Sequence, residues 1–98
     1  MKMNKSLNGS TLTIALEGRL DTNTAPELEM EIKNSLEGIT SLILDFADLE
    51  YISSAGLRVL LAAHKRMSVQ GDMKIKNVNE VIMEVFEVTG FTDILTIE

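Results

Sequence analysis

Two stretches at the start of the chain alternate hydrophobic and polar residues, a pattern typical of strands that bury one face. They cover residues 1–7 and 11–17, and every second residue of the latter is aliphatic. Asn8 and Gly9 between them favour a tight hairpin turn, because both residue types adopt positive φ readily. We therefore expect an antiparallel pair of strands whose second member ends at Gly18.

Apolar residues recur every three or four positions in three later stretches, which predicts helices that bury one face each. The first begins after Thr24, which with Glu27 forms the pattern of a capping box, and it ends before Gly38. The second, residues 55–67, is the most regular. The third follows Asn79, which has a side chain suited to an N-cap.

The remaining apolar stretches predict three strands. Residues 42–46 begin with a continuous apolar run, as in a parallel, central strand buried on both faces, whereas residues 73–76 alternate and residues 94–97 are short. The element order is then β-β-α-β-α-β-α-β. It predicts one α/β domain over residues 1–98, with a mixed, mostly parallel sheet of about five strands and three or four helices. The first hairpin strand should lie antiparallel at an edge.

The composition narrows the classes of function. The chain has 98 residues, 15 acidic and 9 basic, and its net charge of −6 disfavours nucleic acid and anionic membrane surfaces as partners. It has no cysteine and one histidine, so the usual zinc sites cannot form. Its six glycines are isolated from one another, so the sequence contains no glycine-rich phosphate-binding loop. We expect no metal, no cofactor and, because no long apolar segment is present, a cytoplasmic protein.

Polar residues at the junctions between strands and helices are the candidates for function, since binding sites of parallel sheets form there. Asp45, Asp48 and Glu50 offer a carboxylate pair for acid/base chemistry or magnesium, but so small a domain rarely desolvates such a pair, and solvated carboxylates are the simpler interpretation. A small enzyme stays as an alternative. His64 is interpreted as a partly buried helix residue without a catalytic partner.

Ser53 and Ser54 precede the most regular helix. Ser54 is most simply the N-cap of that helix. The start of a helix also favours a phosphoryl group, because its N–H groups are unpaired and the dipole is positive there, and Arg58 lies one turn further on. Ser54 is therefore a candidate both for the cap and for phosphorylation, and the two roles are compatible.

Three segments resemble the STAS domain of bacterial anti-sigma factor antagonists. Residues 42–67 read LILDFADLEYISSAGLRVLLAAHKRM, residues 18–25 look like the Gly-x-Leu-Asp motif of that family, and residues 88–91 look like its closing turn. Many members carry aspartate before the phosphoacceptor serine and serine after it, where this chain has Ser53 and Ala55. The chain also ends soon after its last predicted strand, whereas many members add a helix, so we expect an exposed apolar surface for a partner or for self-association.

The resemblance implies a non-enzymatic bacterial phosphoprotein of signal transduction and transcription regulation that works by partner switching. An anti-sigma factor serine kinase of the GHKL type binds the unphosphorylated protein and phosphorylates Ser54, with Ser53 as second candidate. Phosphorylation releases the kinase, and a phosphoserine phosphatase reverses the step. By position, the docking surface comprises Asp21, Thr22, Asn23, Ser53, Ser54, Gly56 and Arg58. The alternative within the family is a stand-alone STAS module that senses a small ligand or scaffolds a signalling complex without phosphorylation.

Overall fold

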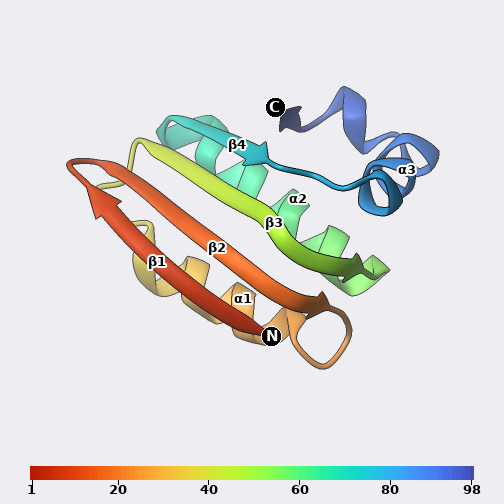
Figure 1. Ribbon diagram of the computed structural model, residues 1–98. Coiled ribbons are helices and arrows are strands. Elements are labelled where there is room, and N and C mark those ends of the chain that lie inside the picture. The colour runs from red at the N-terminus through yellow and green to blue at the C-terminus, as the bar shows by residue number, and fades with distance from the viewer.

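Five strands form one sheet in the order β1-β2-β3-β4-β5, and α1 and α2 cover one of its faces (Figure 1). This computed structural model describes residues 1–98. The elements are β1 (Lys2–Asn8), β2 (Thr11–Leu20), α1 (Ala25–Ser35), β3 (Ser41–Ile52), α2 (Ser54–Gln70), β4 (Asp72–Lys76), α3 (Glu80–Thr89), a 3-10 turn at Phe91–Asp93 and β5 (Thr96–Ile97).

The predicted element order and sheet type are confirmed. Strand β1 lies at one edge and pairs antiparallel with β2, while β2, β3, β4 and β5 pair in parallel. Three α-helices are present, at the lower end of the expected number. Strand β3 is central, as its apolar run predicted.

The hairpin turn lies one residue later than the sequence indicated. Asn8 pairs with Thr11 and stays in the ladder, so Gly9 and Ser10 form the two-residue loop. Only Gly9 has positive φ, at 63°, as in turns that need this conformation at their first central residue alone.

Strands β2 and β3 extend well beyond their predicted ends, Gly18 and Phe46. The β2–β3 register shifts twice, and each shift inserts one extra residue into β3. The buried positions Phe46, Leu49 and Ile52 are therefore three residues apart, so the alternation stops in the sequence although the ladder continues. These extensions carry both strands to the candidate site.

The prediction that β3 is buried on both faces is wrong. Leu42 and Leu44 are fully buried on the helix side, but Ile43 and Asp45 are only partly covered. No helix lies over the opposite face of the sheet (Figure 1). The continuous apolar run therefore reflects a single large residue on the open face.

The core consists of 24 buried hydrophobic residues, and no polar residue is buried. Each fully buried leucine or phenylalanine contributes about 1.5–3 kcal/mol relative to exposure. Helix α3 packs near the C-terminal ends of the central strands, where the ring centres of Phe86 and Phe46 lie 6.4 Å apart. Asn79 is the predicted N-cap of α3: its Oδ1 accepts from the Ile82 N–H at 2.8 Å, and its Nδ2 donates to the Leu49 carbonyl oxygen at 2.9 Å.

Candidate functional site

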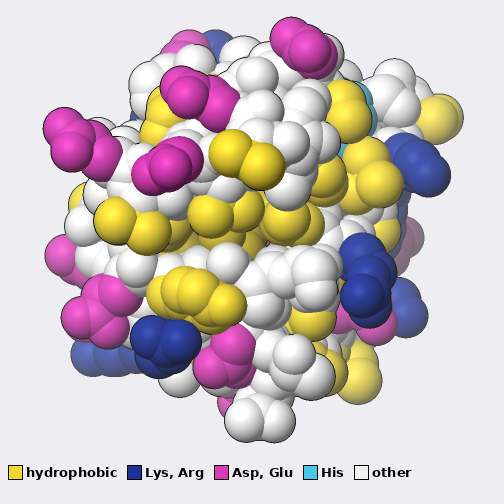
Figure 2. Space-filling model, turned by 90° about the vertical axis from the view of Figure 1, so that its right-hand side faces the viewer, with side chains coloured by type: hydrophobic (Ala, Val, Ile, Leu, Met, Phe, Trp, Pro, Cys, Tyr) yellow, Lys and Arg dark blue, Asp and Glu magenta, His cyan; other side chains and the backbone are white.

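The C-terminal ends of β2 and β3 lie on the same side of the molecule as α3 (Figure 1). Figure 2 shows this side, where a band of hydrophobic side chains crosses the middle, with acidic side chains gathered at the upper left and Lys or Arg side chains at the right and lower left. Protein–protein interfaces commonly have an apolar centre and a polar, solvent-accessible rim.

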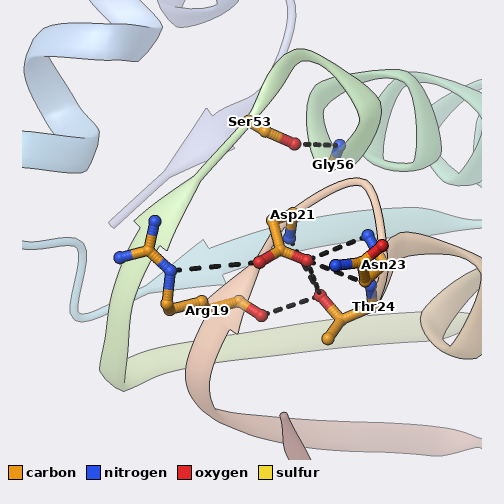
Figure 3. A network of polar contacts seen from close by, with 6 residues as sticks. All are labelled: Arg19, Asp21, Asn23, Thr24, Ser53 and Gly56. Atoms are coloured by element: carbon orange, nitrogen blue, oxygen red, sulfur yellow. Dashed lines mark hydrogen bonds and ion pairs between the residues drawn. The ribbon is translucent and has the colours of Figure 1, made fainter.

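The loop after β2 and the start of α2 meet here, as the sequence predicted. Leu20 pairs with Ile52, and the Ser53 N–H donates to the Leu20 carbonyl oxygen at 2.9 Å. Asp21 and Ser53 are therefore the next residues after a pair of neighbours in the sheet, Leu20 and Ile52. Figure 3 shows the Asp21 side chain in the loop after β2 and the Ser53 side chain at the start of α2.

The Asp21 carboxylate organises the loop that precedes α1. Its Oδ1 accepts hydrogen bonds from the backbone N–H groups of Asn23 (3.0 Å) and Thr24 (3.1 Å) (Figure 3). The Asp21 carbonyl oxygen also accepts from the Ala25 N–H at 2.8 Å. Asp21 thus supplies acceptors to the residues that lead into α1 and to the first N–H group of the helix.

The capping box predicted at Thr24 is absent. Thr24 is the N-cap of α1 by position, but its side chain makes no cap hydrogen bond to the helix. Its Oγ1 instead accepts from the Asp21 N–H at 2.9 Å and donates to the Arg19 carbonyl oxygen at 2.7 Å. Asp21, three residues earlier, already bonds the N–H groups that begin the helix, so the threonine closes the loop.

The pKa of the Asp21 carboxyl lies below its ordinary value. Partial desolvation raises the pKa, but the N–H groups of Thr24 and Asn23, the Thr24 hydroxyl and the Arg19 guanidinium together lower it by more. These groups all favour the charged form. Asp21 therefore carries a negative charge beside the start of α2 at neutral pH.

Arg19 and Tyr51 form a pair that the sequence did not reveal. The two residues are opposite each other in the β2–β3 ladder, and the Arg19 Cζ lies 4.2 Å from the centre of the Tyr51 ring. The Arg19 Nε is also 3.9 Å from Asp21 Oδ2 (Figure 3). An exposed cation–π contact is worth about 0.5–1 kcal/mol. The only sequence signal was Arg19 as the variable residue of the Gly-x-Leu-Asp motif, because the strand register cannot be read from composition.

The N-cap of α2 is Ser53, so the assignment of the cap to Ser54 is wrong. Ser53 has extended backbone, and its Oγ accepts from the Gly56 N–H at 3.5 Å. Its N–H is already fixed by β2, which places it outside the helix. Ser54 is consequently the first residue of α2.

The Ser54 side chain is exposed and its hydroxyl makes no hydrogen bond. It lies in the first turn of a helix with no acidic residue in that turn, and Arg58 is exposed one turn on. Unpaired N–H groups and the positive end of the dipole favour an anion at such a position by about 0.3–1 kcal/mol. The hydroxyl is thus free to react, and its environment accepts a negative product.

Gly56 was expected in the docking surface but is buried, so it cannot contact a partner directly. A Cβ at this position would lie 2.8 Å from the side chains of Leu20 and Ile52. Glycine is needed for the close approach of α2 to the ends of both strands. Its role is to position Ser54 relative to the Asp21 loop.

The other predicted surface residues divide between the loop and α2. Thr22, Asn23 and Arg58 are exposed, and Asp21 and Ser53 are half-buried. Thr22 and Arg58 line a hollow of about 200 Å³ whose wall includes Ala55, the neighbour of Ser54. The structure therefore brings Thr22 and Arg58 together beside Ala55.

The carboxylates considered for an enzyme lie within β3, not in a loop after it. Asp45 Oδ1 accepts from the Ala47 N–H at 3.0 Å and from Asn77 Nδ2 at 2.9 Å, while Asp48 and Glu50 are exposed. No three His, Cys, Asp or Glu side chains are grouped as metal ligands would be.

None of the helices has both the length and the apolar character that crossing a bilayer requires.

Comparison with known proteins gives consistent matches. The family model described as STAS domain matches residues 2–98. A Bordetella bronchiseptica protein named as an anti-sigma factor antagonist, BtrV, is 34% identical over 99% of this chain and 85% of its own length. The anti-sigma-B factor antagonist of Bacillus subtilis is 29% identical over 92% of this chain and 84% of its own.

Solved structures of the anti-sigma factor antagonist SpoIIAA share the fold. The unphosphorylated form superposes with a TM-score of 0.78 at 19% identity, covering 99% of this chain and 87% of that one. The phosphorylated form, from Bacillus, gives 0.77 at 20% identity, covering 99% and 91%.

Proposed function

Since the chain belongs to the STAS domain family, we propose that it is an anti-sigma factor antagonist whose binding to an anti-sigma factor kinase is controlled by phosphorylation of Ser54. It works by binding in the cytoplasm and catalyses no reaction. The observation that carries the proposal is the Ser54 hydroxyl: exposed, without a hydrogen bond, and on the first residue of α2 beside the Asp21 loop.

Ser54 is a better phosphoacceptor than Ser53. The Ser53 hydroxyl is half-buried and already accepts from the Gly56 N–H, so a kinase reaches it less readily than the exposed Ser54 hydroxyl. A phosphoryl group on Ser54 would extend into solvent and leave that cap in place. This difference in exposure favours Ser54.

Phosphorylation should change binding and leave the fold intact. It adds about −1.5 to −2 charge at neutral pH, which the first turn of a helix receives well. In support, SpoIIAA has been solved in both forms, and this chain superposes on them equally well. A bound kinase, in contrast, would have to bury the dianion next to the Asp21 carboxylate, at a cost of about 2–5 kcal/mol.

The partners implied are a serine kinase of the GHKL type, which also holds the sigma factor, and a phosphoserine phosphatase that restores binding. The docking surface for the kinase consists of the exposed and half-buried residues around Ser54, namely Asp21, Thr22, Asn23, Ser53 and Arg58. Arg19 and Tyr51 extend it on the other side of Asp21.

Incubation with the GHKL-type anti-sigma factor kinases of the same genome and ATP tests the proposal. We expect at least one kinase to bind the chain and to transfer a single phosphoryl group, which peptide mass spectrometry locates on Ser54. The Ser54→Ala variant should bind the same kinase and remain unmodified. Phosphate on another residue, or binding by none of these kinases, would contradict the proposal.

A further inference from the structure

Helices α1 and α2 leave a groove between them that begins beside Ser54. Two hollows of about 200 and 230 Å³ share the lining residues Glu29 and Val59, so they lie next to each other between α1 and α2 and are treated as two parts of one groove. Its first part is lined by Thr22, Ala55 and Arg58. Its second part is lined by residues one to two helical turns further along α2, Ala62, Ala63 and Arg66, together with Ile32 and Lys33 of α1.

One stripe of α2 makes a wall of this groove. Its members recur every three or four residues and are Ala55, Arg58, Val59, Ala62, Ala63 and Arg66. Four of the six are alanine or valine, which leaves room between the helices. The floor is apolar, because Ile32, Val59 and Ala63 are at most 6% exposed and lie open only to the groove.

The groove is positively charged on an acidic protein. Its charged lining residues are three cations, Lys33, Arg58 and Arg66, and one carboxylate, Glu29, which gives +2 where the whole chain carries −6. Glu29 is paired with Lys33 at 3.7 Å. Arg58 and Arg66 form no ion pair, and α2 contains no acidic residue. Arg66 Nη1 donates to the Lys33 carbonyl oxygen at 3.4 Å. The other N–H groups of Arg66 and the Arg58 guanidinium are available to carboxylates of a partner.

The two arginines define a spacing. They are eight residues apart on one helix, which corresponds to about 12 Å or two turns. A partner helix laid along the groove would meet them with two carboxylates two turns apart. An apolar side chain midway between those carboxylates would lie over the Val59 and Ala63 floor.

We propose that this groove binds a helix of the anti-sigma factor kinase that carries an apolar anchor between two acidic residues. The inference rests on the proposed function and extends its docking surface away from the phosphorylation site. A stable interface buries about 800 Å² per partner, roughly a seventh of the 5416 Å² accessible here, and Ser54 and its neighbours form one part of such an area. The groove supplies area continuous with them.

A second copy of the chain is a less suitable occupant. Its helix α3 carries Glu80, Glu84 and Glu87 and matches the charge of the groove, but α3 inserted between α1 and α2 of another copy is a heterologous contact. Such contacts build open chains unless a rotation closes them. The groove is thus better matched to a different protein.

Charge reversal in the groove tests the proposal against a matched control. Arg66→Glu changes an exposed residue three turns from Ser54, and Lys65→Glu makes the same change on the same helix outside the groove. We expect Arg66→Glu to raise the Kd for the kinase at least tenfold and to raise the KM for phosphorylation similarly. Lys65→Glu should stay within threefold of the unaltered chain, and both variants should melt as it does.

Thiol protection gives a second measurement that does not depend on charge. The chain has no cysteine, so Ala62→Cys introduces a single thiol in the groove. Val69 is on the same helix outside the groove and is 90% exposed, so Val69→Cys provides the control thiol. Bound kinase should slow modification by a thiol reagent at least tenfold at position 62 and leave position 69 unchanged.

The outcomes separate the two proposals. If the kinase binds the unaltered chain but Arg66→Glu binds equally well and position 62 stays reactive, the groove proposal fails and the proposed function stands. If no kinase binds the unaltered chain, both fail. If the chain alone sediments as an oligomer that Arg66→Glu dissociates, the groove is occupied by a second copy and the proposal is overturned.

Discussion

The Ser53 N–H donates a hydrogen bond of 2.9 Å to the Leu20 carbonyl oxygen, which joins the start of α2 to the end of β2. Leu20 is followed by Asp21 and Ser53 by Ser54, so this single bond fixes the acidic loop next to the candidate phosphoacceptor. The pairing of Leu20 with Ile52 makes the arrangement part of the sheet. The site is therefore anchored directly to the ends of two strands of the sheet.

The two serines should differ in their contribution to stability. Ser53→Ala removes the N-cap of α2 and should lower the free energy of unfolding by about 0.5–1 kcal/mol, the lower part of the usual range because the cap bond is 3.5 Å long. Ser54→Ala removes a hydroxyl without a hydrogen bond and should change it by less than about 0.5 kcal/mol. Urea denaturation measures both. Equal losses would mean that the caps have been assigned incorrectly.

Gly56→Ala should destabilise the domain although it improves helix propensity. The added methyl group would lie 2.8 Å from the Leu20 and Ile52 side chains, and overpacking of this kind costs about 1–3 kcal/mol against a gain of up to about 1 kcal/mol. We expect a net loss on the order of 1 kcal/mol in urea denaturation. Kinase affinity should fall as well, because the displaced helix carries Ser54. A variant as stable as the unaltered chain would contradict the close approach.

Asp21 should contribute to both stability and binding. Asp21→Asn keeps an oxygen that can accept from the Asn23 and Thr24 N–H groups, whereas Asp21→Lys removes the acceptor. We expect Asp21→Asn to melt close to the unaltered chain and to bind the kinase more weakly, and Asp21→Lys to lose melting temperature as well. Thermal melts and titrations with the kinase separate the two effects. Unchanged binding in Asp21→Asn would remove the carboxylate from the docking surface.

The lowered pKa of Asp21 predicts a specific pH dependence. A carboxyl whose pKa is lower in the folded protein stabilises the fold fully above its ordinary value of 3.8 and loses that contribution as the pH falls through the folded value. Stability should therefore decrease on acidification below about pH 4. The decrease should be smaller in Asp21→Asn, which has no group to protonate there. Identical pH profiles for the two proteins would show that Asp21 is not held in its charged form.

Sequence periodicity located the elements whose patterns are unbroken. Helix α2 and strand β4 begin within one residue of their predicted starts, and the match to the STAS family confirms the resemblance read from residues 18–25, 42–67 and 88–91. The end of β3 was missed because two bulges change the spacing of its buried residues from two to three. The end of β2 was missed because Gly18 was interpreted as its stop, although Leu20 continues the same buried face. The periodicity of apolar residues indicates which face of a strand each residue lies on. It does not show that strand pairing continues past a bulge.

The details of the site depended on tertiary contacts. Ser53 and Ser54 are equally good caps by residue type, and the contacts of Ser53 with Leu20 and with the Gly56 N–H decide between them. Thr24 matched a capping pattern but is used by the Asp21 loop. The contact between Arg19 and Tyr51 follows from strand register across more than thirty residues of sequence. The sequence showed which residue types are present at the site, but not which hydrogen bonds and contacts they make.

Calorimetric titration of the partner kinase against the unmodified chain and the chain phosphorylated on Ser54 tests the account most directly. The cost of burying the phosphoryl dianion, about 2–5 kcal/mol, predicts an affinity lower by roughly 30-fold to a few thousand-fold for the phosphorylated chain. Ser54→Ala should bind as tightly as the unmodified chain. The phosphorylated and unmodified chains should melt at similar temperatures. Equal affinity of the phosphorylated and unmodified chains would contradict the switch at Ser54.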